Sequence, residues 1–165
     1  MRILSLDKDD YWKAIIEWTH PCKWNKEEKC VYLTNKYKRE YGIYRFERRH
    51  GNQKSGRENI YIGHAFDQTF DIRLHQGFHE AKIKKAGIGE IWVSLGIINL
   101  KKSKHLKQRY REIEKILIYF TQPKQNEKEK SWGPDCQFEI INKGHRGPLP
   151  YYIRYPVAEI KERFI

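Results

Sequence analysis

Four side chains are suited to the cleavage of phosphate esters, and they come from four separate segments. They are Tyr44, Tyr61, Arg73 and Glu114. An arginine offers a planar fork of N–H donors for the charge that builds on phosphoryl oxygens in a transition state. A glutamate is a hard oxygen ligand suited to one Mg²⁺ ion that keeps most of its waters. A tyrosine has an ordinary pKa of about 10, so it acts as a base only where positive charge stabilises its phenolate.

Two short segments position the tyrosines. Residues 41–46 and 59–65 are rich in aromatic and β-branched side chains, which is typical of strands, and a Gly- and Asn-containing connection lies between them. They therefore predict an antiparallel hairpin. Because alternate residues of a strand share a face, we expect the hydroxyls of Tyr44 and Tyr61 to lie side by side above the sheet.

Helices position the other two side chains. The pattern predicts a helix over about 68–79 that begins after Asp67 and carries Arg73. Apolar residues that recur every three or four positions from Leu106 to Phe120 predict the longest helix, which carries Glu114.

The remaining segments complete an α/β fold of the α+β type. We expect a small three-stranded antiparallel sheet flanked by helices, with residues 90–99 as its third strand. Asp9 or Asp10 is a suitable cap for a short helix that runs through Trp18. The chain, residues 1–165, is expected to form a single domain with three parts: a core at 41–126, an N-terminal helical extension at 1–40, and a C-terminal addition at 127–165 with a further strand at about 137–142.

The order of these residues resembles the GIY-YIG nuclease domains. Gly42-Ile43-Tyr44 and Tyr61-Ile62-Gly63 give both tripeptides in order, and Arg73 follows on a predicted helix. Glu114 is then followed by Pro123 and Asn126 at the family's spacing. Either tripeptide alone is a weak signal, since a strand tyrosine more often serves packing than catalysis. The joint order and spacing carry the resemblance, which covers about residues 41–126 and includes excision-repair, homing and type II restriction endonucleases.

The resemblance implies a Mg²⁺- or Mn²⁺-dependent DNA endonuclease that uses one ion. Tyr44 would activate or orient the attacking water, and Tyr61 would bond to the water or to the scissile phosphate. Arg73 would stabilise the phosphoryl oxygens, and Glu114 would bind the metal ion. Structural roles fall to Gly42, Gly63 and Asn126. The alternative is a nucleic-acid-binding module with little or no cleavage, because a fold does not guarantee a function.

This sequence departs from the family pattern in four places. The connection between the two tripeptides is long and basic, and Arg73 lies further beyond Gly63 than in typical members, which lengthens the approach to its helix. Gly77 stands where many members carry a histidine, so His75 and His79 are both candidates to replace it, with His79 preferred. His64 stands where many relatives carry a lysine near the phosphate, and it is a further catalytic candidate.

The charge indicates a polyanionic partner. The net charge is +12, and the segments 36–57 and 101–130 each contribute +6. We therefore expect DNA as the partner, and we expect four residues beside the core to contact its backbone without reading bases: Arg48, Arg49, Lys101 and Lys102. The alternative is that these charges only keep the surface solvated.

The cysteines and the apolar runs indicate a cytoplasmic protein. Cys22, Cys30 and Cys136 are too few for a disulfide framework, and their spacing matches no compact zinc knuckle, so free thiols are expected. No apolar run approaches the length of about 20 residues that a membrane span needs, and no secretory signal is visible. The sequence leaves open whether the protein is a monomer or a homodimer.

Overall fold

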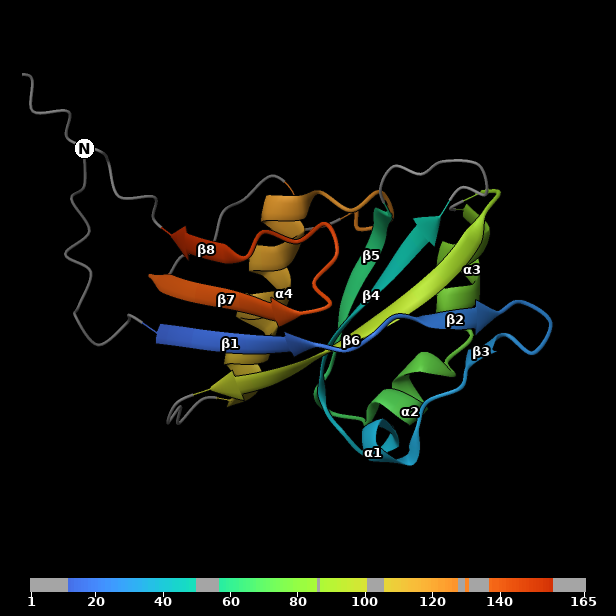
Figure 1. Cartoon of the computed structure of the whole chain (residues 1–165), viewed down its shortest axis with the longest axis horizontal. Helices are drawn as coiled ribbons and strands as arrows, with labels where there is room; N and C mark the ends of the chain where they lie inside the picture. The colour runs from blue at the N-terminus through green and yellow to red at the C-terminus, as the bar shows by residue number, and fades with distance from the viewer. Residues whose placement is uncertain are drawn as a thin grey trace, which may run out of the picture.

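One mixed sheet dominates the molecule. The computed structural model describes residues 12–49, 57–85, 87–100, 106–127, 130 and 137–155. The strands in these ranges are β1 (Trp12–Trp18), β2 (Cys22–Asn25), β3 (Cys30–Val31), β4 (Gly42–Arg49), β5 (Glu58–Ala65), β6 (Glu90–Leu100), β7 (Phe138–Gly144) and β8 (Tyr152–Tyr155). The helices are α1 (Asn35–Lys38), α2 (Phe70–Leu74), α3 (Phe78–Lys85) and α4 (Leu106–Thr121). Figure 1 shows the long strand β6 crossing the centre of the sheet.

The expected small three-stranded sheet is wrong, because the described strands form a sheet of eight. β4 pairs with β5 and with β6, all antiparallel, so the three expected strands do lie together. However, the other edge of β6 pairs with β2 at Val93 and with β1 from Gly96 to Leu100. β1 also pairs with β7, which pairs with β8, and β2 pairs with β3. The extra strands exist because β6 is 11 residues long and offers both edges.

The helix expected through Trp18 is also wrong, because residues 12–18 form the strand β1. Trp12, Ala14, Ile16 and Trp18 are all buried, and the residues between them are more exposed. This alternation has the period of a strand with one face in the core. β1 lies between β6, which is antiparallel to it, and β7, which is parallel to it.

The helix expected at 68–79 is two short helices. α2 ends at Leu74, and α3 begins at Phe78 after a turn that contains Gly77. Asp67 does not cap α2, since the N-cap position is Thr69. The carboxylate of Asp67 lies instead 2.7 Å from Nζ of Lys107 at the start of α4. Arg73 is therefore held near a helix end rather than in the middle of a long helix.

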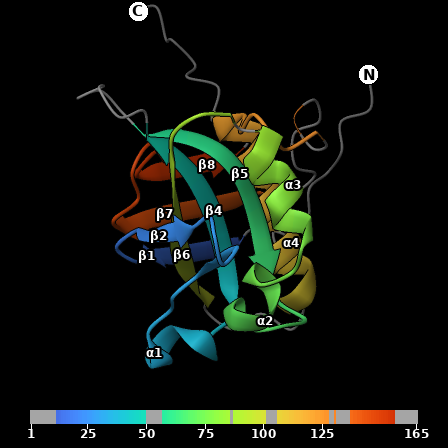
Figure 2. The same ribbon diagram turned by 90° about the vertical axis from the view of Figure 1, so that its right-hand side faces the viewer.

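The β4–β5 hairpin is buried on both faces. Successive side chains of a strand point to opposite faces. Tyr44 and Phe46 belong to one apolar cluster with residues of α2 and α3, whereas Ile43 and Ile62 belong to a second cluster with residues of α4. Figure 1 shows the hairpin between α4 and α3, and Figure 2 shows α2 near the end of β5. This arrangement packs α4 against one face of the hairpin and α2 and α3 against the other.

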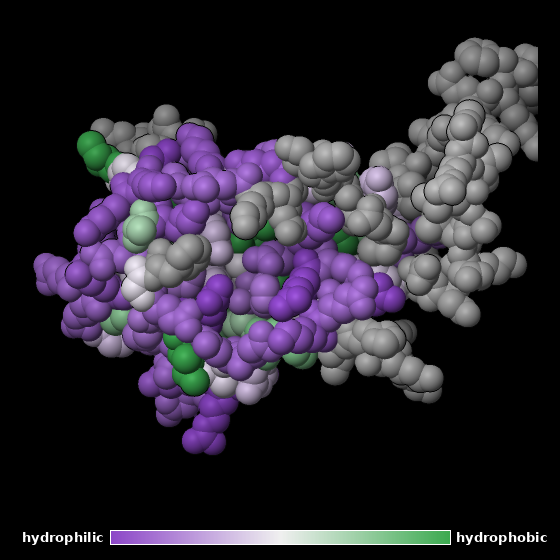
Figure 3. Space-filling model, turned by 180° about the vertical axis from the view of Figure 1, so that it is seen from behind, coloured by the Kyte–Doolittle hydropathy of each residue, from purple (hydrophilic) through white to green (hydrophobic). Residues whose placement is uncertain are grey.

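The described surface is mainly polar. Figure 3 shows that the hydrophobic residues on the rear face are confined to small, separate spots among hydrophilic ones. No helix in the described part of the chain is long and apolar enough to cross a membrane. Cys22 and Cys30 are free thiols, and Cys136 lies outside the described residues.

Candidate active site

The two tyrosines of the motifs lie together on the hairpin. The structure pairs Tyr44 with Gly63 and Phe46 with Tyr61, so Tyr44 and Tyr61 are diagonal neighbours on one face. Their ring centroids are 6.2 Å apart, and each phenol acts on the ionisation of the other. A Cβ atom on residue 63 would overlap the Tyr44 hydroxyl. Gly63 therefore leaves the space that the Tyr44 phenol occupies.

Gly42 has a similar steric role at the start of β4. A Cβ atom at this position would overlap the carbonyl oxygen of Gly96 on β6. Only glycine permits this close approach of β4 to β6. The first glycine of the motif thus sets how the strand that carries Tyr44 packs against the rest of the sheet.

Arg73 reaches the tyrosines from α2. Its guanidinium lies close enough to the Tyr44 hydroxyl to act on the ionisation of that phenol. Burial raises the pKa of Tyr44 well above its ordinary value, and the charge of Arg73 opposes this shift only in part. Burial, reinforced by the charge of Glu114, raises the pKa of Tyr61 to about 12. Both phenols are therefore protonated at neutral pH and act as O–H donors.

His79 comes from α3 and is completely buried. Its Nε2 atom lies 3.0 Å from the carbonyl oxygen of Arg73 and 3.4 Å from the hydroxyl of Tyr44. Because a carbonyl oxygen only accepts, this network assigns the proton to Nε2, which then donates to Arg73. Burial lowers the pKa of His79 to about 4, so the ring is neutral at pH 7. In this arrangement His79 donates to the backbone of Arg73, and its ring packs edge-on against Tyr44.

The other two candidate histidines have different surroundings. His64 on β5 is partly exposed, and its Nδ1 lies 2.6 Å from Oε2 of Glu114. His75 is exposed, and its Nδ1 lies 2.5 Å from the carbonyl oxygen of Asp71 in the preceding helix α2. The structure therefore brings His64 and His79 to the tyrosines and Glu114, and it leaves His75 on the surface at the end of α2.

Glu114 reaches the same place from α4. Its side chain is 19% exposed, and its charge acts on the ionisation of Tyr44, Tyr61 and Arg73. Among the described residues, no group of three or more His, Cys, Asp or Glu side chains is arranged to hold a metal ion. A carboxylate has about four lone-pair sites, so the bond from His64 leaves Glu114 able to bind a cation as well. One carboxylate beside two hydroxyls fits Mg²⁺, which keeps several of its own waters.

Asn126 closes the outer edge of β5. Its side chain is buried, accepts a hydrogen bond from the backbone N–H of Ile62 and donates one to the carbonyl of Ile62, both at 2.9 Å. The N–H of Gln125 also donates to the carbonyl of Ile60 at 2.8 Å. The segment after α4 therefore satisfies backbone groups that a further strand would otherwise pair. This fixes the strand that carries Tyr61 against the helix that carries Glu114.

Two of the four residues expected to contact DNA, Arg48 and Arg49, lie outside this cluster. Arg48 and Arg49 are the last two residues of β4. Arg48 bonds to Oε2 of Glu58 at 2.5 Å, and the guanidinium of Arg49 lies 5.1 Å from the ring centre of Trp92. Lys101 and Lys102 lie outside the described residues. The structure thus gives Arg48 and Arg49 local partners and leaves their expected role a prediction.

Sequence reasoning missed Lys82 of α3. Its ammonium group lies 6.0 Å from the ring centre of Tyr61 and donates to the carbonyl of Gln125 at 2.9 Å. It therefore connects α3 with the segment that covers β5. One lysine in a lysine-rich helix gives no signal by itself, because its role depends on the segment from 122 to 127 folding back over β5.

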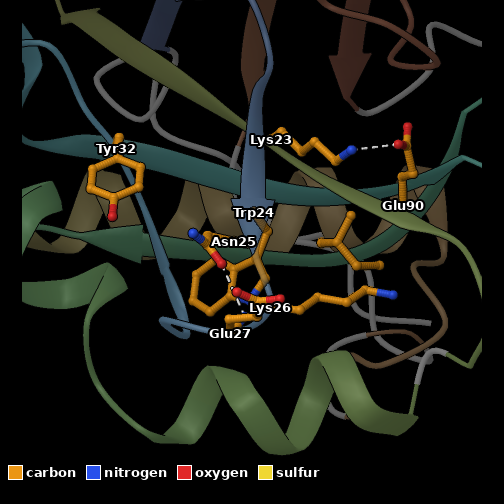
Figure 4. A pocket seen from close by; sticks show the side chains of 8 residues that line it. Lys23, Trp24, Asn25, Lys26, Glu27, Tyr32 and Glu90 are labelled. Atoms are coloured by element: carbon orange, nitrogen blue, oxygen red, sulfur yellow. Dashed lines mark hydrogen bonds and ion pairs between the residues drawn. The ribbon is translucent and has the colours of Figure 1, made fainter.

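A hollow of about 530 Å³ lies elsewhere, between β2 and the start of β6. Figure 4 shows Trp24 and Tyr32 in its wall and the ion pair between Lys23 and Glu90 at its side. None of the residues that line it is a motif residue or a candidate histidine. The candidate active site is therefore a convergence of side chains around β5 and is separate from this hollow.

Comparisons with known proteins add no assignment. No protein-family profile matches the chain, and searches of curated proteins and of solved structures find no match. A proposal for the function therefore depends on the motif residues and on their geometry.

Proposed function

We propose that this chain is a DNA endonuclease that hydrolyses phosphodiester bonds with one divalent cation, as the GIY-YIG nucleases that its motifs resemble do. The observation that carries the proposal is the convergence of Tyr44, Tyr61, Arg73 and Glu114 from β4, β5, α2 and α4. These side chains are far apart in sequence and are coupled in the folded chain by hydrogen bonds or charge. Packing alone does not require an arginine and a glutamate beside two buried phenols.

The surroundings of each side chain support a particular role. The pKa of Tyr44 is strongly raised by burial, which favours orienting the attacking water through its hydroxyl over removing a proton from that water. Tyr61 is 8% exposed, and its O–H would donate to a phosphate oxygen. The remaining N–H donors of Arg73 would stabilise charge on the phosphoryl group.

The cation would be held by Glu114. Mg²⁺ or Mn²⁺ at this carboxylate would supply Lewis-acid stabilisation of negative charge at the scissile phosphate. The contact from His64 to Oε2 would orient the carboxylate, as a hydrogen bond to a metal-binding group commonly does. His79, buried between Arg73 and Tyr44, would keep both in place.

The test is cleavage of supercoiled plasmid by the purified protein with Mg²⁺, with Mn²⁺ and with EDTA. We expect nicking that requires the cation and that Glu114→Gln abolishes without loss of DNA binding, because the substitution removes a metal ligand and a repulsion against phosphate. The exposed Glu27→Gln, on the turn between β2 and β3, is the matched control and should cleave normally. Cleavage by Glu114→Gln at the wild-type rate would refute the assignment.

The second candidate is a binding module without cleavage. It would bind DNA in the same assay and would leave the plasmid intact with either cation. The filled set of motif residues favours the enzyme. We also propose the cytoplasm as its location, since Cys22 and Cys30 are free thiols.

A further inference from the structure

A chain of hydrogen bonds supports the Arg73 guanidinium from behind. Besides its contact with Tyr44, Arg73 donates from Nη1 to Oε1 of Gln76 at 2.7 Å. Gln76 in turn donates from Nε2 to Oε1 of Gln68 at 2.5 Å. All three side chains are partly buried. The guanidinium is thus fixed by two carboxamides in series.

The direction of each bond follows from the arginine. A guanidinium has donors and no acceptor, so the carboxamide of Gln76 must present its oxygen to Arg73. Its NH₂ group then faces Gln68, which must present its own oxygen. This order leaves neither amide free to flip without losing a hydrogen bond. Gln76 and Gln68 therefore restrict the side chain of Arg73, and a free arginine side chain has about 2 kcal/mol of rotamer entropy.

The backbone of Gln76 links the same residues. Its N–H bonds to the carbonyl of Arg73 at 3.4 Å, and its carbonyl accepts from the N–H of His79 at 3.1 Å. Gln76 thus contacts Arg73 through both its backbone and its side chain, at the turn where the expected helix breaks into α2 and α3. A change of its side chain alone leaves the backbone links in place.

Gln68 lies in the connection between β5 and α2, the segment that is lengthened ahead of Arg73. A longer connection gives the following helix more freedom of position. The Gln68–Gln76 bond closes this connection against the turn after α2. We propose that Gln76, supported by Gln68, is a positioning residue that fixes the Arg73 guanidinium for stabilisation of the phosphoryl group, an inference that rests on the proposed nuclease function.

Kinetics provide the first test. We expect Gln76→Ala to lower kcat for plasmid nicking by about 10- to 100-fold, the scale of one hydrogen bond to a charged group, with KM nearly unchanged. Gln76→Glu keeps an acceptor for Nη1 and should recover most of the rate. In the Arg73→Ala background, Gln76→Ala should cost less than about twofold, because its effect passes through Arg73. The control is Gln108→Ala, which replaces an exposed glutamine of α4 that bonds to Glu112 of the same helix, and it should cleave normally.

A measurement without activity separates the two proposals. Side-chain nitrogen NMR reports rotation of the Arg73 guanidinium, with the signal assigned by its loss in Arg73→Lys. We expect hindered rotation in the wild type and faster rotation in Gln76→Ala. Equal rotation in both, or full additivity of the two alanine variants, would overturn the positioning role even if the protein cleaves DNA. A Gln76-dependent rotation in a protein that does not cleave would instead overturn the nuclease proposal alone.

Discussion

Replacement of Asn126 by aspartate tests separately the two hydrogen bonds that this side chain makes with the backbone of Ile62 in β5. At neutral pH, the introduced carboxylate keeps an oxygen that accepts from the N–H of Ile62, but it has no proton to donate to the carbonyl of Ile62. One buried acceptor is then left unpaired beside a carboxylate that is itself poorly solvated. Each such group costs about 1–3 kcal/mol, and more where it is charged. We therefore expect Asn126→Asp to lower the free energy of unfolding by about 2–5 kcal/mol at pH 7.

The decrease in stability should depend on pH in a defined direction. Burial disfavours the charged form, so the pKa of the introduced carboxyl group is raised in the folded state above its unfolded value of about 3.9. Below the unfolded value the acid is protonated in both states and can donate to Ile62, so the variant should approach the wild type. As the pH rises above about 3.9, the variant should lose about 1.4 kcal/mol per pH unit relative to the wild type, up to the folded pKa.

Urea unfolding followed by circular dichroism at several pH values from about 4 to about 7, the range above the unfolded pKa, measures both effects. The stability of the wild type at each pH is subtracted, which removes the titration of all other groups. Asn35→Asp, at an exposed position in α1, is the matched control and should change stability by less than about 0.5 kcal/mol. A pH-independent difference between Asn126→Asp and the wild type, or no difference at pH 7, would show that Asn126 does not hold β5 through these two bonds.

Three further predictions concern the site and the DNA path. Gly63→Ala should lower the free energy of unfolding by about 1–3 kcal/mol and displace the Tyr44 phenol, because the new methyl group overlaps the phenol's hydroxyl. The control in the same unfolding assay is Gly77→Ala, whose methyl group meets no atom within 4 Å. Arg73→Ala should lower the nicking rate by about 10²–10³-fold, the scale of removing one donor to a developing oxyanion, and a decrease of less than about tenfold in single-turnover assays would place Arg73 outside the reaction. Neutralising the four expected phosphate-binding residues, Arg48, Arg49, Lys101 and Lys102, should weaken binding to all duplexes alike. The slope of log K against log salt concentration should become shallower by about one unit for each lost phosphate contact. An unchanged slope would place the DNA path elsewhere.

Local patterns in the sequence were enough to predict the elements that carry Tyr44, Tyr61 and Glu114, but not the short helix that carries Arg73. The aromatic and β-branched segments that carry Tyr44 and Tyr61 form strands that pair with each other, and the apolar stripe that carries Glu114 forms α4. A strand hairpin and a long amphipathic helix need only short-range periodicity to be predicted. The sequence also indicated the side chains that the structure gathers around β5, since their types and order carry the resemblance.

Long-range packing set the extent of the sheet and the supports of the site. The apolar residues from Trp12 to Trp18 fit a helix or a strand about equally well in so short a segment, and pairing with β6 and β7 selects the strand. The contact between His79 and Arg73, the two bonds of Asn126 and the pair of Gln68 with Gln76 join residues across turns or elements. Their partners are set by how α2, α3 and the segment after α4 pack on β5, and no local pattern in the sequence contains that information.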